Sequence, residues 1–492
     1  MLKMDLGKRG VIKRINKLLG NKEISCKELT NKYIDEIEKS DLNAYVEVCK
    51  EEALKMAEKV DKKISSGEKI GALEGIPMTL KDNISTKCIE TKCCSKILKG
   101  YKPIYNASVW ESLLNDGAVL LGKTNMDEFA MGSACENSCM GRAKNPHDKS
   151  RVTGGSSGGG AAAVAGNLAV YALGSDTGGS IRQPASFCGI VGLKPTYGSV
   201  SRYGLVAYAS SFDQIGPITQ TAEDAAIVFD AIKGYDAKDS TSIKIESGLS
   251  YNELNNSIKG LKIGVPKEYY DGVNEEVKSS IEKAMKVYES LGAKIEYFSL
   301  PEVKYSLPVY YILVCAEAAS NLARFDGVRY GYRTENYKDI NEMMCKTRSE
   351  GFGAEVKRRI LLGNYVLSSG YYDAYYKKAQ DLRKVIANAF NRAFEKFDVL
   401  LTPTSPFTAF EAGKEYGSPT EIYLADICTA PVNTVGIPGI SVPCGFDSKS
   451  LPVGMQILGA KFSESRLLNV AHQYEIATNY ENNKSLGTGV RL

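Results

Sequence analysis

The chain has 492 residues, of which 43% are hydrophobic and 24% are charged, a composition that supports a large folded core and excludes a disordered protein. Its 62 basic and 58 acidic side chains leave a formal net charge of +4, which excludes a broad electrostatic grip on nucleic acid. The sequence contains no signal-peptide core and no run of 18 apolar residues, so we expect a soluble, cytoplasmic protein.

The first predicted element is a helix from Ser25 to about residue 63. Ser25 and Glu28 have the spacing of a capping box. Apolar residues then recur on one helical face, at Leu29, Tyr33, Ile34 and Ile37. We expect residues 1–70 to form an N-terminal helical segment that packs on the rest of a single domain spanning 1–492.

Farther along the chain, short apolar runs alternate with amphipathic segments. The apolar runs, which predict buried strands, are 117–125, 169–176, 261–266 and 398–404. The amphipathic segments 274–292 and 363–397 predict covering helices, the second continuing toward the strand that follows it. This alternation indicates an α/β fold with a largely buried sheet.

Twelve cysteines are spread irregularly from Cys26 to Cys444. At this dilution they indicate reduced thiols rather than a disulfide framework. The closest group, Cys88, Cys93 and Cys94, has no second ligand pair or neighbouring histidine that would complete a zinc site. We therefore expect no metal centre.

The densest chemical signal is a pair of glycine-rich loops, 153–166 and 174–196, which contain Ser156 and Ser180. Glycine allows a backbone to approach a ligand closely and to present amide N–H groups to an anion. The alternative is a pair of tight turns between buried elements. A nucleophilic serine also needs a base, most often histidine, and this chain has only two histidines.

Residues 154–158 also match the G-x-S-x-G elbow of α/β-hydrolases, with Asp426 and His472 following in the required order. That elbow requires a buried strand before its serine, whereas segment 145–153 is polar and contains proline. His472 falls on a predicted helical face, so we interpret it as structural. A nucleotide-binding P-loop is excluded because alanines follow the glycine run where lysine and serine or threonine would be needed.

Lysine remains as a possible base. Lys81 follows the strand-like run 76–80, which would carry its side chain into the interior. Burial penalises an ammonium group and lowers the pKa of a lysine, so that a neutral amine can accept a proton. The alternative is a surface lysine beside Asp82.

Taken together, these residues resemble the amidase signature family. The segments that carry the resemblance are 71–84, 122–138, 153–166, 174–196 and 451–459. The resemblance implies an α/β/α fold around one large, mixed, twisted β-sheet. It also implies a Ser–Ser–Lys triad in which Lys81 is the base, Ser156 is the bridging serine held by a cis peptide, and Ser180 is the nucleophile.

With Ser180 as nucleophile, the backbone amides of Thr177, Gly178 and Gly179 are expected to form the oxyanion hole. Asp176 and Arg182 flank the nucleophile, and we expect an ion pair between them to brace its loop.

The resemblance further implies a pocket for free glutamine. Arg359 and Asp426 match the residues that bind the α-carboxylate and the α-ammonium group in the family. Their alternative is an ordinary surface salt bridge. Tyr310 or Tyr311 is expected to line the same pocket.

Within the family, segments 320–331, 355–380 and 424–445 are most similar to the glutaminase subunits of three-subunit, tRNA-dependent amidotransferases. This implies hydrolysis of glutamine to glutamate and ammonia, with subunits B and C as partners in a heterotrimer. A partner would hold the misacylated tRNA, either Glu-tRNA(Gln) or Asp-tRNA(Asn), and would bind ATP and Mg²⁺. No cofactor is expected in this chain.

Two alternatives remain. A stand-alone amidase of the same family would use identical chemistry on a small amide. A non-catalytic scaffold would keep the fold for assembly alone, but the complete set of Lys81, Ser156 and Ser180 argues against it.

Overall fold

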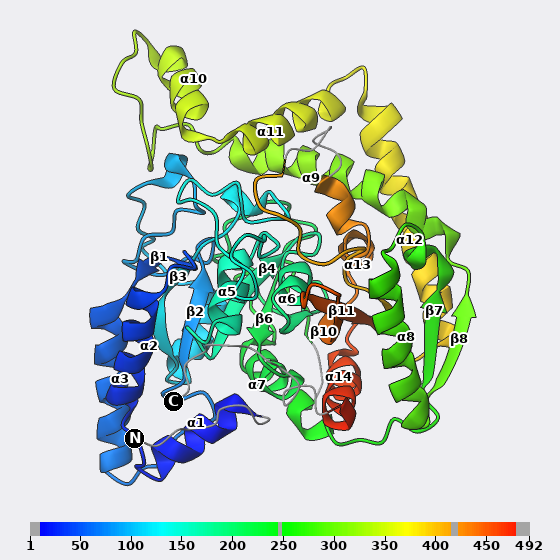
Figure 1. Ribbon diagram of the computed structural model, residues 1–492. Coiled ribbons are helices and arrows are strands. Elements are labelled where there is room, and N and C mark those ends of the chain that lie inside the picture. Colours follow the sequence, from blue (N-terminus) through cyan, green and yellow to red (C-terminus); the bar gives the residue numbers. More distant parts are fainter. Residues whose placement is uncertain (1–9, 245–247, 415–421, 479–492) are drawn as a thin grey trace.

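The computed structural model describes residues 10–244, 248–414 and 422–478, whose strands form one large mixed sheet (Figure 1). The eleven strands follow the order β1-β3-β2-β4-β6-β5-β10-β11-β9-β7-β8. Their bounds are β1 Tyr45–Val48, β2 Pro77–Lys81, β3 Val119–Thr124, β4 Tyr171–Asp176, β5 Val191–Lys194, β6 Gln214–Thr219, β7 Lys262–Pro266, β8 Lys294–Phe298, β9 Val399–Pro403, β10 Gly439–Phe446 and β11 Pro452–Leu458. Strand β2 runs parallel to β3 and β4, and β7 runs parallel to β8 and β9, while the other pairs are antiparallel.

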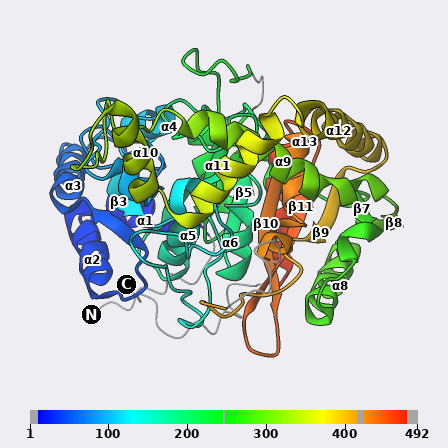
Figure 2. The same cartoon turned by 90° about the horizontal axis from the view of Figure 1, so that it is seen from above.

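Helices cover both faces of this sheet, which gives three layers (Figures 1 and 2). The first layer shares one apolar cluster and consists of α1 (Val11–Gly20), α2 (Cys26–Lys39), α3 (Lys50–Ser65), α4 (Ser108–Asn115), α7 (Ala222–Ile232), α8 (Glu275–Ser290) and α14 (Glu464–Thr478). The second layer consists of α5 (Gly158–Ala165), α6 (Arg182–Phe187), α9 (Ser306–Leu322), α11 (Ala354–Leu367), α12 (Lys378–Lys396) and α13 (Ala430–Val435). Helix α10 (Ile340–Gly351) contacts the short helix Lys96–Leu98. The α/β/α class expected from the sequence is confirmed.

All four apolar runs predicted as strands are strands. Run 117–125 contains β3, 169–176 contains β4, 261–266 contains β7 and 398–404 contains β9. Every residue of β3, β4 and β9 is buried, as expected for strands covered on both faces.

The helix predicted from Ser25 to about residue 63 is wrong as a single element. The capping box of Ser25 and Glu28 is present at the start of α2, but this helix ends at Lys39, and strand β1 separates it from α3. Asn43 adopts a φ of 51° in this connection, a left-handed conformation that a right-handed helix cannot continue. The segment 1–70 therefore supplies an edge strand of the sheet in addition to helices.

The continuous helix predicted through 363–397 is also interrupted. Helix α11 ends at Leu367, and a π-helical turn, Tyr372–Lys377, precedes α12. Ser368 is extended, with a ψ of 150°, and a second serine and Gly370 follow it. These residues compete poorly for helical conformation, so the chain turns between the two helices.

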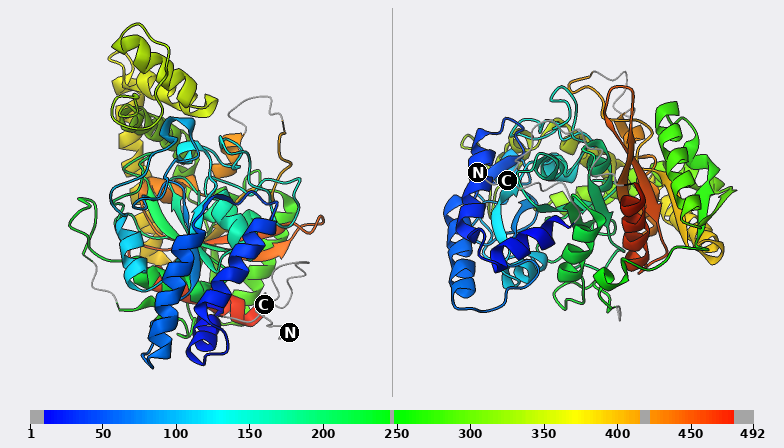
Figure 3. Two further views of the ribbon diagram at one scale, coloured as in Figure 1. Left: turned by 90° about the vertical axis from the view of Figure 1, so that its left-hand side faces the viewer. Right: turned by 60° about the horizontal axis from the view of Figure 1, so that its bottom comes forward.

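Two features of the fold position the site. Strands β2 and β4 are parallel neighbours, so their carboxyl ends lie at the same edge of the sheet. Helices α10 and α11 form the end of the molecule opposite α1, as Figures 1 and 3 show from different directions.

Within the described residues, no helix is long and apolar enough to cross a bilayer.

Candidate active site

Lys81 ends strand β2 in the protein interior, where 1% of its surface is exposed. Its Nζ donates hydrogen bonds to Ser156 Oγ at 2.7 Å, to Ser175 Oγ at 2.9 Å and to Ser175 O at 3.1 Å. Burial lowers the pKa of Lys81 to about 8, and the carboxylates of Asp127 and Asp176 oppose this shift without cancelling it. A neutral amine is therefore accessible close to neutral pH, and a surface position for Lys81 is excluded.

The loop before α5 brings Ser156 to Lys81. The peptide between Gly155 and Ser156 is cis, as the family resemblance implied. The Gly155 amide donates to Gln183 Oε1 at 2.9 Å, and the carbonyl of Ser156 accepts from the Asp127 amide at 3.2 Å. The Ser156 backbone is thus held on both sides while its hydroxyl faces Lys81.

Ser180 follows β4 in the second glycine-rich loop and is 7% exposed. Its carbonyl accepts a hydrogen bond from the Ser157 amide at 3.1 Å, so the two serine loops lie against each other. Among the hydrogen bonds of the described residues, none joins the hydroxyls of Ser156 and Ser180. The structure thus brings Lys81 and Ser156 into contact and places Ser180 in the adjoining loop, and the contact between the two hydroxyls stays a prediction.

The ion pair predicted between Asp176 and Arg182 is present and fully buried. Arg182 donates to Asp176 Oδ2 through Nε at 3.0 Å and to Oδ1 through Nη2 at 2.9 Å. Burial alone would raise the pKa of Asp176, but the charge and hydrogen bonds of Arg182 outweigh it and hold that pKa at about 2. The same carboxylate accepts from the amides of Gly179 at 2.9 Å and Ile181 at 3.1 Å, so it anchors both sides of Ser180.

The predicted oxyanion loop is closely packed. Gly179 has a φ of +138°, and a Cβ at this position would lie 2.2 Å from Thr429 Oγ1. A Cβ at Gly178 would lie 2.3 Å from the Tyr310 hydroxyl. The Thr177 hydroxyl donates to Asp213 Oδ1 at 2.7 Å. The Gly179 amide already donates to Asp176. The amides of the other two members of the predicted set, Thr177 and Gly178, make no hydrogen bond to that carboxylate.

Arg359 projects from α11 and is buried, with 3% of its surface exposed. Its Nε donates to Glu355 Oε1 at 2.8 Å, and its Nη1 donates to the Tyr208 hydroxyl at 2.5 Å. The guanidinium carbon lies 5.4 Å from the ring centroids of both Tyr311 and Tyr423. These contacts enclose the cation in an aromatic box.

Asp426, at the end of the short helix Ile422–Asp426, is likewise buried. Its carboxylate accepts hydrogen bonds from Ser133 Oγ at 2.9 Å and from the Tyr311 hydroxyl at 2.8 Å. Burial raises the pKa of Asp426 to about 6, against the lowering effect of these hydrogen bonds and of Arg359. Arg359 and Asp426 therefore share one buried environment with Tyr311 between them, and the alternative of a surface salt bridge is wrong.

Both predicted tyrosines belong to this environment. Tyr310 and Tyr311 are consecutive residues of α9, and their rings meet edge to face at 5.0 Å. Tyr311 contacts Asp426, whereas Tyr310 faces the backbone at Gly178. The two side chains thus connect Arg359 and Asp426 with the loop that contains Ser180.

Sequence reasoning missed four residues that contact Arg359 or Asp426, namely Ser133, Tyr208, Glu355 and Tyr423. The spacing of Glu355 and Arg359 on one helix was a usable signal, because residues four positions apart share a face. Tyr208 reaches the site from a loop remote in sequence, which no local pattern indicates.

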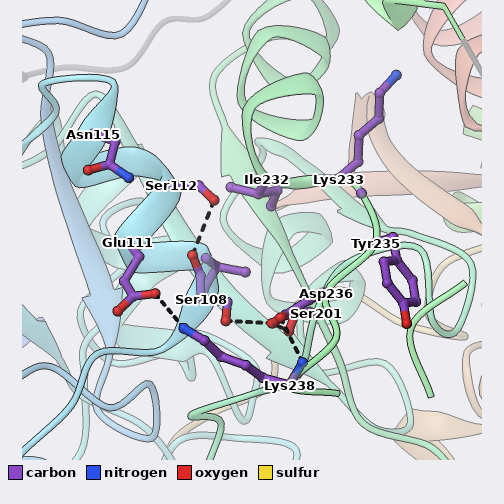
Figure 4. A pocket seen from close by; sticks show the side chains of 12 residues that line it. Ser108, Glu111, Ser112, Asn115, Ser201, Ile232, Lys233, Tyr235, Asp236 and Lys238 are labelled. Atoms are coloured by element: carbon purple, nitrogen blue, oxygen red, sulfur yellow. Dashed lines mark hydrogen bonds and ion pairs between the residues drawn. The ribbon is translucent and has the colours of Figure 1, made fainter. Parts of the chain in front are cut away.

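A hollow of about 280 Å³ lies between α4 and the segment that follows α7 (Figure 4). Asp236 accepts hydrogen bonds from Ser108 and Ser201 there, both at 2.6 Å, and Lys238 forms an ion pair with Glu111 at 3.0 Å. The charges of its wall thus neutralise one another, and none of its lining residues belongs to the predicted site. Among the described residues, no three histidine, cysteine or acidic side chains gather as a metal-binding group.

Comparison with known proteins agrees with this geometry. The model of the amidase family matches residues 28–468, and the chain belongs to this family. It is 56% identical over 473 residues to the A subunit of glutamyl-tRNA(Gln) amidotransferase from Caldanaerobacter subterraneus, and the match covers 96% of each chain. The family and the fold class expected from the sequence are confirmed.

Solved structures give the same result. The crystal structure of the A subunit of glutamyl-tRNA(Gln) amidotransferase from Thermotoga maritima is 46% identical, with a TM-score of 0.72 over 83% of this chain and 84% of that chain. A bacterial aryl acylamidase of the amidase signature family has a TM-score of 0.84 at 26% identity, over 96% of this chain and 97% of that chain. The fold is therefore shared by relatives with different substrates.

Proposed function

We propose that this chain is the glutaminase subunit of a tRNA-dependent amidotransferase acting on Glu-tRNA(Gln). The observation that carries the proposal is the 2.7 Å contact between buried Lys81 and Ser156 beside the Ser180 loop. Tyr310 and Tyr311 connect this loop with the buried side chains of Arg359 and Asp426. The extensive identity to glutamyl-tRNA(Gln) amidotransferase chains supports the same conclusion. As part of the complex, the chain contributes to a carbon–nitrogen ligase.

In the proposed mechanism, neutral Lys81 accepts the proton of the Ser156 hydroxyl, which accepts that of Ser180 as the Ser180 oxygen attacks the side-chain amide of glutamine. The new C–O bond forms a γ-glutamyl ester, and the C–N bond breaks as the relayed proton reaches the nitrogen and ammonia leaves. Water, deprotonated through the same relay, then hydrolyses the ester. The products are glutamate, ammonia and the original enzyme.

The oxyanion of each tetrahedral intermediate is stabilised by the loop amides at Thr177 and Gly178. Gly179, the third residue of the predicted set, donates its amide to Asp176 and holds the loop in this conformation. Asp176 and Arg182 act indirectly, because their ion pair fixes the amides on either side of Ser180. A donor that is already oriented needs no reorganisation when the negative charge develops.

Arg359 and Asp426 recognise the parts of glutamine that do not react. The guanidinium group suits a bidentate α-carboxylate, and the Asp426 carboxylate suits the α-ammonium group. Tyr310 and Tyr311 form the pocket wall between them. A small amide without these α-groups would gain nothing from either charge.

Partner subunits B and C complete the reaction. A chain with a formal net charge of +4 and no P-loop motif is a poor candidate for gripping tRNA or activating its carboxylate with ATP. We assign ATP, Mg²⁺ and the misacylated tRNA, either Glu-tRNA(Gln) or Asp-tRNA(Asn), to the partner. Ammonia would pass to that partner within a heterotrimer in the cytoplasm, shielded from protonation by bulk water.

The test is ammonia release from glutamine, measured for the chain alone and for the complex with subunits B and C, ATP, Mg²⁺ and misacylated tRNA. We expect weak hydrolysis by the chain alone and stimulation by the full set, with Ser180→Ala inactive in both. Efficient turnover of small amides, with no response to partners and no preference for glutamine, would establish the alternative of a stand-alone amidase.

A further inference from the structure

The two recognition residues do not pair with each other, although both are charged and buried. In the described residues, each carboxylate oxygen of Asp426 is bonded to hydroxyl groups, and the ion pair of Arg359 is made with Glu355. Buried opposite charges in one environment normally pair, because each is costly to leave alone. Something in the structure therefore keeps Arg359 and Asp426 apart.

Glu355 is the first of two residues that hold Arg359 away from Asp426. Its Oε1 accepts from Arg359 Nε at 2.8 Å and also from the Tyr423 hydroxyl at 2.9 Å. The Nε side of the guanidinium is thereby occupied, while Nη2 makes no hydrogen bond to any described residue. This orientation leaves the end of the guanidinium group available for a carboxylate ligand.

Tyr423 is the second residue that holds Arg359 away from Asp426. Its ring stacks on Tyr311 with centroids 4.0 Å apart and planes inclined by 18°, and the Tyr311 hydroxyl donates to Asp426. Tyr423 also precedes Asp426 by three residues in the same short helix. One side chain thus connects the position of Asp426 with that of Glu355 on α11.

These contacts form a continuous series from Arg359 through Glu355, Tyr423 and Tyr311 to Asp426. If the Glu355 carboxylate were removed, Arg359 would be left near Asp426, a carboxylate whose pKa it already lowers. A pair between Arg359 and Asp426 would occupy both charges that free glutamine needs.

We propose that Glu355 and Tyr423 are positioning residues that set specificity for an α-amino acid amide by holding Arg359 and Asp426 apart and correctly oriented. This inference rests on the proposed glutaminase function. It assigns selectivity to residues that act through Arg359 and Asp426.

The experiment uses the complex with subunits B and C and compares glutamine with a primary aliphatic amide that lacks the α-groups. Glu355→Gln keeps the side-chain volume and removes the charge. We expect it to raise the glutamine KM about tenfold or more, because this corresponds to the loss of one charge-assisted hydrogen bond. The kcat for glutamine and the turnover of the simple amide should change little. Tyr423→Phe keeps the ring and removes the hydroxyl, so a smaller increase in KM is expected.

Because Glu355 and Tyr423 share one hydrogen bond, their double variant should raise KM by less than the product of the single effects. Lys357→Gln, an exposed change on the same helix, is the control and should behave as wild type. Equal losses on both substrates, or an unchanged glutamine KM in Glu355→Gln, would overturn the inference. If Glu355→Gln fails to fold, Tyr423→Phe decides by the same criterion. Glutamine hydrolysis retained by Ser180→Ala would instead refute the proposed function.

Discussion

Lys81 and Ser156 are 75 positions apart in sequence, yet the lysine amine and the serine hydroxyl lie 2.7 Å apart inside the protein. The contact matters because burial keeps the amine close to its neutral form, with a pKa of about 8. A buried lysine bonded to a serine hydroxyl can perform the task for which many hydrolases use histidine.

This pKa predicts the pH dependence of acylation. The base acts only when neutral, so the rate should rise as pH increases through about 8 and then level off. Single-turnover formation of the acyl-enzyme at a series of pH values measures this directly. A rate that falls on alkalinisation through the same range would contradict the neutral lysine.

Lys81→Met should abolish formation of the acyl-enzyme, and Lys123→Met offers a matched control. Lys123 is also fully buried with a pKa lowered to about 8, but its Nζ bonds to the Ile84 carbonyl and to two threonine hydroxyls. Activity per folded molecule should survive in the control. Equal losses in both variants would mean that burial of a lysine, and not its contact with Ser156, accounts for the effect.

Ser156→Ala and Ser180→Ala should differ in which part of the reaction they remove. The Ser180 variant lacks the acyl acceptor, so it should lose both glutamine hydrolysis and labelling by a fluorophosphonate. The Ser156 variant should lose orders of magnitude in rate with little change in folding stability, because only the proton relay is broken. Full activity without the Ser156 hydroxyl would show that Lys81 reaches Ser180 directly.

Asp176 and Arg182 should be strongly coupled. Removing either partner leaves an uncompensated buried charge, at a cost of about 3 to 5 kcal/mol, whereas removing both leaves neither charge unpaired. Chemical unfolding of Asp176→Ala, Arg182→Ala and the double variant forms the cycle. We expect the double variant to be less destabilised than the sum of the single variants, and an additive result would argue against the bracing role.

The pKa of Asp426 predicts a second pH effect, confined to glutamine. Binding of an α-ammonium group needs the carboxylate, which is protonated as pH falls through about 6. The glutamine KM should therefore rise below this value, while a simple amide should show only the loss caused by protonated Lys81. A constant ratio of kcat/KM for the two substrates across this range would remove Asp426 from recognition.

Gly179→Ala should reduce turnover severely. The new methyl group would meet Thr429 Oγ1 at 2.2 Å, and a φ of +138° is unfavourable for alanine. Displacement of the loop would misplace the oxyanion donors, and loss of one such donor typically costs about a hundredfold in rate. Steady-state kcat checks this, and near-normal turnover would show that the loop tolerates displacement.

The sequence predicted the buried strands and the two serine loops better than it predicted the residues around Arg359 and Asp426. The apolar runs at β3, β4, β7 and β9 were identifiable because they are buried on both faces, and the serine loops were identifiable by their glycines. The division between α2 and α3 was missed because the helical pattern resumes after β1. Tyr208 was missed because its position depends on the packing of remote segments, which no local periodicity records.

The proposed catalytic lysine and serines lie at the end of β2 and in the loops before α5 and after β4, whereas Arg359, Tyr311 and Asp426 come from α11, α9 and a short helix outside the sheet. In the proposed function, the reacting groups and the groups that select the substrate therefore belong to separate parts of the molecule. We expect that substitutions on the outer helices would redirect the enzyme to another amide while the reacting groups remain in place. A fold divided in this way allows evolution, or an engineer, to exchange the substrate without rebuilding the catalyst.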